Sequence, residues 1–145
     1  MHATVSKARY VLNLAFANEI SVGVVSHPSL LRVPDDHEKL STNPTPILFN
    51  TCETDPMYPA EAQKKGDELL GNGTQEGEKY KRNYYPGCTH GFAVRGDQSD
   101  PKVKHGKEDS FKESVEWYVP ASFRGPSGCD AVISSSRRFI PYLTS

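Results

Sequence analysis

The sequence has little of what marks membrane, nucleic-acid-binding and disulfide-rich proteins. No apolar run approaches the roughly 20 residues that a membrane-spanning helix needs. The net charge of -1 gives no electrostatic reason to expect binding to nucleic acid or to an anionic membrane. The three cysteines are odd in number and lack C-x-x-C spacing, which argues against a disulfide framework or a zinc site. The N-terminus lacks the apolar region of a signal peptide, so we expect a cytoplasmic protein.

What the sequence does have is the alternation of helix and strand patterns typical of an α/β domain. Apolar residues at helical spacing predict an amphipathic helix over residues 8–16. The β-branched run ISVGVVS (20–26) and the run PILFN (46–50) predict buried parallel strands. The more polar KYKRNYY (79–85) predicts a third strand, nearer the edge of the sheet. The fold class is therefore α/β, with a mostly parallel sheet and flanking helices.

Further helices and loops complete this prediction. Pro59 suits the start of a helix that Gly71 would cap at its end. Residues 33–45 indicate a polar, Pro-rich loop with a short helical piece around Glu38. A last amphipathic helix is indicated by the spacing of Phe111, Val115 and Tyr118. We expect residues 1–118 to form the domain and residues 119–145, which have no clear period, to form a poorly ordered tail.

Two loops follow predicted strands, at the sheet edge where open α/β sheets place their sites. The loop CETDPMYP (52–59) contains Asp55, and the loop PGCTHGFAVRGD (86–97) contains His90. An acid beside an imidazole can hold its tautomer and stabilise the imidazolium during proton transfer. The plainer alternatives are an Asx-turn or helix cap for Asp55, and a loop histidine satisfied by its neighbours for His90.

These segments resemble the dienelactone hydrolase family, especially its fungal members. The match extends over residues 8–118, and its segments are HPSLL (27–31), PILFNTCETDPMYP (46–59), YPGCTHGFAVRGD (85–97) and FKESVEWY (111–118). The resemblance implies an α/β-hydrolase fold, incomplete here because only its C-terminal strands are present. It also implies cofactor-free hydrolysis of a small-molecule ester or lactone by a Cys-Asp-His triad. Asp55 would be the triad acid and His90 the base.

The family's nucleophile elbow, G-x-C-x-G, falls on residues that do not fit it. Val5 stands in the place of the cysteine, while Ala3 and Lys7 replace the two glycines. A strained strand-to-helix turn needs small residues, and lysine fits poorly there. We therefore expect the chain to retain the acid and base but to be inactive alone. Ser6 and Cys88 stay open as replacement nucleophiles, although a cysteine at a strand end is more often a small buried hydrophobe.

Other interpretations remain open beside the enzyme. The chain would be a non-catalytic binding module if the fold were kept without the chemistry, or a truncated gene product if an upstream segment carried the elbow. Strand 20–26 would lack the elbow strand beside it, so its edge favours self-association. Arg95 lies one residue beyond the position of a substrate-binding arginine in bacterial relatives, so we do not expect it to bind a carboxylate.

The remaining polar residues suggest no second site. His27 and Glu53 have no further ligands at metal-binding spacing, so we expect no metal. We expect three histidines in polar contexts to be solvated: His2, His37 and His105.

Overall fold

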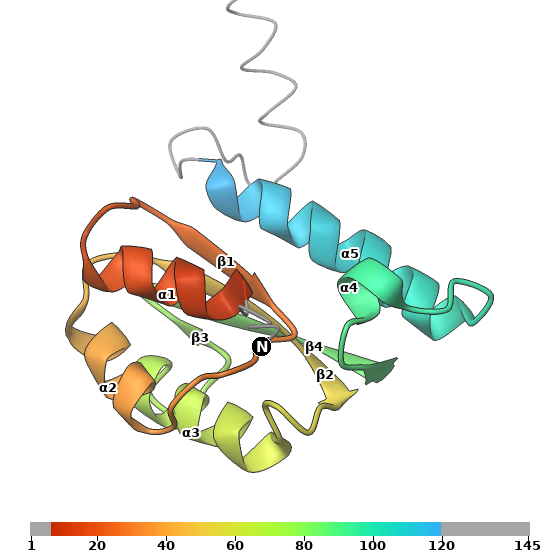
Figure 1. Ribbon diagram of the computed structural model, residues 1–145, viewed down its shortest axis with the longest axis horizontal. Helices are drawn as coiled ribbons and strands as arrows, with labels where there is room; N and C mark the ends of the chain where they lie inside the picture. Colours follow the sequence, from red (N-terminus) through yellow and green to blue (C-terminus); the bar gives the residue numbers. More distant parts are fainter. Residues whose placement is uncertain (1–6, 120–145) are drawn as a thin grey trace, which may run out of the picture.

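The computed structural model describes residues 7–119 as one mixed α/β unit (Figure 1). Its helices are α1 (Lys7–Phe16), α2 (Asp35–Thr42), α3 (Ala60–Leu70), α4 (Phe92–Arg95) and α5 (Pro101–Tyr118). Its strands are β1 (Gly23–Ser26), β2 (Ile47–Thr54), β3 (Glu76–Gly77) and β4 (Tyr80–Thr89). Of the expected tail, only Val119 is among the described residues. Four N-terminal residues named above also lie outside them: His2, Ala3, Val5 and Ser6.

The strands form one sheet in the order β1-β2-β4-β3. Strands β1, β2 and β4 run parallel, and the short β3 is antiparallel to β4. Every residue of β2 from Ile47 to Cys52 is buried, as expected for a central parallel strand that is covered on both faces. The predicted α/β class with a mostly parallel sheet is therefore confirmed.

Helices α1, α2 and α3 cover one face of the sheet, and α5 covers the other (Figure 1). Ala8, Leu12 and Ala15 are buried along a single stripe of α1, which confirms the predicted amphipathic helix. On the opposite face, α5 approaches the sheet closely at Gly106. A Cβ atom there would lie 2.6 Å from the Sγ atom of Cys88, so this contact requires glycine.

Several predicted boundaries change in the structure. The first strand is confined to Gly23–Ser26, whereas the last one continues from Tyr80 to Thr89. Strand β4 is not the outermost strand, because the short strand Glu76–Gly77 pairs with its beginning. Helix α5 extends from Pro101 to Tyr118, and the three apolar residues whose spacing predicts it, Phe111, Val115 and Tyr118, are exposed. Asp100 caps this helix by accepting a hydrogen bond from the backbone N–H of Lys102.

The prediction that His37 is solvated is wrong. Its ring is fully buried on α2 and stacks beside Tyr58, whose hydroxyl lies 2.7 Å from Nε2. The polar sequence around His37 misled the prediction, because Asp36 in the same helix is also buried and pairs with Arg9 of α1. Burial lowers the pKa of His37 to about 4, so the ring is neutral at neutral pH. The expected exposure of His105 is confirmed.

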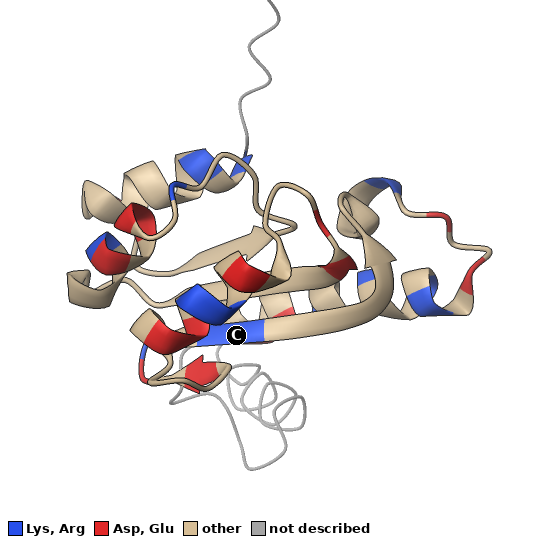
Figure 2. Cartoon of the chain, turned by 90° about the horizontal axis from the view of Figure 1, so that it is seen from below, with Lys and Arg blue, Asp and Glu red and all other residues tan. Residues whose placement is uncertain are grey.

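The surface of the described chain mixes both signs of charge. In Figure 2, Lys and Arg lie among Asp and Glu, and neither sign gathers on one face in that view of residues 7–119. The expectation of no nucleic-acid binding stays a prediction. None of the helices within residues 7–119 combines the length and apolarity required to span a bilayer.

Candidate active site

Asp55 lies directly after β2, where the chain turns toward α3. Its Oδ1 atom accepts hydrogen bonds from the backbone N–H groups of Met57 (2.9 Å) and Tyr58 (3.2 Å). These bonds are the Asx-turn that the sequence offers as the plainer interpretation. The side chain is buried, so the local turn also fixes where the carboxylate points.

His90 follows the last residue of β4 and lies beside Asp55. Its Nδ1 atom is 2.8 Å from Oδ1 of Asp55, and its backbone N–H donates to the carbonyl of Thr54 at 3.0 Å. Because a carboxylate accepts, Nδ1 carries the proton and Nε2 bears the lone pair of the neutral ring. The side chain is 28% exposed, so the imidazole can be reached from outside. The structure therefore brings the two predicted site residues together.

One hydrogen bond and one glycine turn hold in place the loops of Asp55 and His90, here called the acid–base pair. The carboxylate of Glu53 accepts a hydrogen bond of 2.6 Å from the backbone N–H of Gly87. Gly91, directly after His90, has φ of 90°, a left-handed conformation that glycine adopts without a steric penalty. This turn ends β4 and leads into α4, so it determines where the imidazole projects.

Cys52 is a neighbour of the pair that the sequence analysis missed. Its Sγ atom lies 3.8 Å from Oδ2 of Asp55 and is completely buried. Burial, followed by the charge of Asp55, raises the pKa of the Cys52 thiol to about 12. The thiol therefore stays protonated and donates to the carboxylate. In the sequence, the only indication of this contact is that Cys52 lies three residues before Asp55, at the end of a strand.

Cys88 has the features of a structural cysteine. It packs in a cluster with Cys52, Tyr85 and Phe92, and its Sγ atom lies 3.6 Å from the carbonyl oxygen of Lys102. Burial raises the pKa of its thiol, which reduces the thiolate fraction that a nucleophile needs. Its position therefore supports the interpretation as a small buried residue.

Arg95 and His27 lie around the pair. Arg95 ends α4 and is exposed, and within residues 7–119 its guanidinium forms no hydrogen bond or ion pair. The centroid of the His27 ring is 5.1 Å from that of His90. The sequence pattern suggests no role for His27 beyond that of a metal ligand, for which it has no partners at suitable spacing. No cluster of three or more His, Cys, Asp or Glu side chains in the described part of the chain fits a metal ion.

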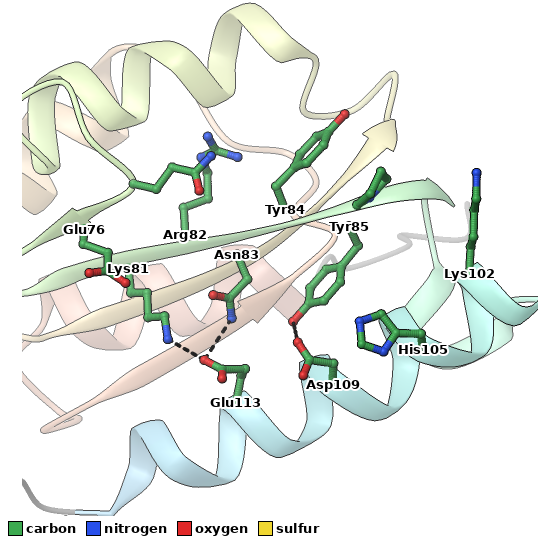
Figure 3. A pocket seen from close by; sticks show the side chains of 12 residues that line it. Glu76, Lys81, Arg82, Asn83, Tyr84, Tyr85, Lys102, His105, Asp109 and Glu113 are labelled. Atoms are coloured by element: carbon green, nitrogen blue, oxygen red, sulfur yellow. Dashed lines mark hydrogen bonds and ion pairs between the residues drawn. The ribbon is translucent and has the colours of Figure 1, made fainter. Parts of the chain in front are cut away.

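A polar pocket of about 630 Å³ lies elsewhere, along β4 and α5 (Figure 3). Lys81, Asn83 and Tyr85 point from β4 toward α5. There Glu113 accepts from Lys81 and Asn83, and Asp109 accepts from Tyr85. Neither Asp55 nor His90 lines this pocket, so it is separate from the acid–base pair.

Comparisons with known proteins agree with the resemblance seen in the sequence. The model of the dienelactone hydrolase family matches residues 8–122. Hydrolase tropI of Talaromyces stipitatus is 30% identical over 110 residues, which cover 76% of this chain and 41% of that protein. Dienlactone hydrolase 1 of Gibberella moniliformis is 31% identical over 111 residues, which cover 76% of this chain and 40% of that protein.

The chain thus spans about two fifths of the length of the curated relatives it matches. The matched residues include the whole sheet, both site loops and all the helices except the first residue of α1. The chain belongs to the dienelactone hydrolase family, and its fold is the α/β-hydrolase fold of that family.

Proposed function

We propose that this chain supplies the acid and the base of a hydrolase that cleaves carboxylic ester or lactone bonds through a Cys-Asp-His triad. The observation that carries the proposal is the hydrogen bond of 2.8 Å between Nδ1 of His90 and Asp55 at the carboxyl end of the sheet. Because Nδ1 is bonded to Asp55, Nε2 remains the basic atom of an accessible ring. The names of the relatives, both hydrolases, support the same reaction type.

In this mechanism a cysteine thiol gives its proton to Nε2 of His90, and the sulfur bonds to the substrate carbonyl carbon. Asp55 holds the imidazole tautomer and stabilises the imidazolium. The tetrahedral intermediate then expels the alcohol, which takes the proton back from His90, and a thioester remains. Water hydrolyses the thioester by the same route, which gives the acid and restores the thiol. For a lactone, the alcohol and the acid belong to one product molecule.

We further propose that the nucleophile does not come from the described residues. Cys52 and Cys88 are both buried and have raised thiol pKa values. Val5 stands where the family's elbow would place its cysteine. The chain alone is then inactive, and a partner segment that carries an elbow completes the enzyme.

Self-association belongs to the same proposal. Within residues 7–119, β1 pairs only with β2, so the outer edge of Gly23–Ser26 has no neighbouring strand. An unpaired strand edge is a template for pairing with another chain. We propose that two copies meet at this edge when no elbow strand occupies it.

A fusion protein tests the proposed function. The N-terminal half of a complete dienelactone hydrolase, through its G-x-C-x-G elbow, is joined to Ala8, and hydrolysis of p-nitrophenyl acetate is measured. We expect activity that His90→Ala largely removes. Asp55→Asn should lower the activity strongly, since the corresponding change lowers kcat on the order of 10⁴-fold in a serine protease. His105→Ala and Asp35→Asn, at exposed positions, are the matched controls.

Two results would contradict the proposal. An active fusion that tolerated both His90→Ala and Asp55→Asn would refute the assignment of acid and base. A fusion that folded but had no hydrolase activity would favour the non-catalytic binding module instead.

A further inference from the structure

His27 occupies a strained position at the carboxyl end of β1. Its backbone N–H donates to the carbonyl of Asn50 at 2.8 Å and so continues the pairing of β1 with β2. Its φ is 38°, a left-handed value that is uncommon for residues other than glycine. Pro28 follows, and a residue before proline favours extended backbone. Strain of this kind persists only where the surrounding structure enforces it, often at functional sites.

The strained backbone places the His27 ring against His90. The ring centroids are 5.1 Å apart with an interplanar angle of 70°, and the Phe92 ring lies 5.9 Å from His27 at 75°. Both are the edge-to-face geometry that aromatic rings prefer. His90 is therefore held from two directions: Asp55 binds Nδ1, and His27 packs against the ring.

The polar atoms of His27 play no visible part in this contact. Its Nε2 atom is buried and has no hydrogen-bond partner among residues 7–119. Burial lowers the pKa of His27, and the neighbouring His90 and Arg95 lower it further. A hydrogen bond with its own backbone and the charge of Asp55 raise this pKa, but by less. The ring is thus neutral at neutral pH and adds no like charge beside an imidazolium at His90.

We propose that His27 is a positioning residue, whose ring holds the His90 imidazole in the orientation that keeps Nδ1 on Asp55 and leaves Nε2 open. The catalytic meaning of this role rests on the proposed function. The contact itself is a property of the chain and can be measured without any hydrolysis.

Nuclear magnetic resonance of the full 145-residue chain, labelled with ¹⁵N-histidine, tests the proposal. The Nδ1–H proton of His90, hydrogen-bonded to Asp55, should give a low-field resonance that exchanges slowly with water. Asp55→Asn and His90→Gln, which remove it, establish its assignment. We expect His27→Ala to speed this exchange at least about tenfold, because the ring then moves away from the carboxylate more often. His27→Phe should keep the slow exchange, since it preserves the aromatic wall.

Amide spectra show whether each variant is folded, and His105→Ala controls for the loss of a histidine elsewhere. A folded His27→Ala chain with unchanged exchange would overturn the proposal, as would His27→Phe behaving like His27→Ala. Absence of the low-field resonance from the folded unmodified chain would overturn it too.

A second measurement covers the case in which His27→Ala does not fold. Because His90 lowers the pKa of His27, His90→Gln should raise it. A titration of His27 that did not respond to His90→Gln would refute the contact. An inactive elbow fusion in which these signals were preserved would count against the proposed function and leave the role of His27 standing.

Discussion

Removing the carboxylate of Asp67 should destabilise the whole sheet, because it leaves a buried guanidinium without its counterion. Arg82 donates to Asp67 from Nε (2.8 Å) and Nη2 (2.6 Å), and Tyr80 donates to the same carboxylate at 2.8 Å. The Arg82 side chain is 7% exposed, and its remaining partners are the neutral Thr51 and Gln63. Breaking a buried ion pair from one side costs about 3–5 kcal/mol. The 13% exposure of the Asp67 side chain admits some water, so we expect about 3 kcal/mol.

Urea unfolding measures this effect. With an m-value of about 1 kcal/mol/M, Asp67→Ala should lower the midpoint by roughly 3 M, a large part of the stability of an ordinary domain. Glu68→Ala is the control on the same helix: it removes only the exposed pair with Lys65 and should cost no more than about 0.5 kcal/mol. The double change Asp67→Leu/Arg82→Met should recover most of the loss, because no charge remains buried. Equal midpoints for Asp67→Ala and Glu68→Ala would refute the reasoning.

Three further outcomes are expected. The chain alone should hydrolyse p-nitrophenyl acetate no faster than imidazole at the same concentration; a His90-dependent rate that Cys88→Ala abolished would reveal a replacement nucleophile. Size exclusion should show oligomers, while a sharp monomer peak with cooperative urea unfolding would contradict pairing at the β1 edge. The pKa of His37 is about 4 in the folded chain, against a usual value of 6.5. Between these two pH values the unfolded state binds more protons than the folded state, so the free energy of unfolding falls as the pH falls from 6.5 to 4. Between pH 6.5 and 4, the free energy of unfolding of the unmodified chain should fall by about 3 kcal/mol more than that of His37→Gln. Equal decreases for the two chains in urea titrations would show that the buried His37 does not cause this pH dependence.

The sequence predicts best the elements whose burial follows a single repeating pattern. Strand β2 is apolar from Ile47 to Phe49 and lies between two neighbours, and α1 buries one stripe, so both were recognisable from residue type and spacing. Helix α2 was recognised only in part, because its buried face includes Asp36 and His37, whose partners come from distant residues. Strand β3 was missed, since a two-residue strand exists only through its pairing with β4.

In the candidate site, too, some features follow from residue type and spacing and others do not. Asp55 and His90 were predictable together, because the carboxyl ends of parallel strands meet at one edge of a sheet. The contact between His27 and His90 was not, because it depends on the register that sets Ser26 beside Asn50 and on a left-handed backbone at His27. Cys52 reaches Asp55 for a comparable reason: the shift in pairing between Cys52 and Thr54 comes just before the turn that fixes the carboxylate. Residue type therefore indicates which groups form the candidate site. Sheet register and local backbone conformation, however, decide which neighbours hold those groups in place.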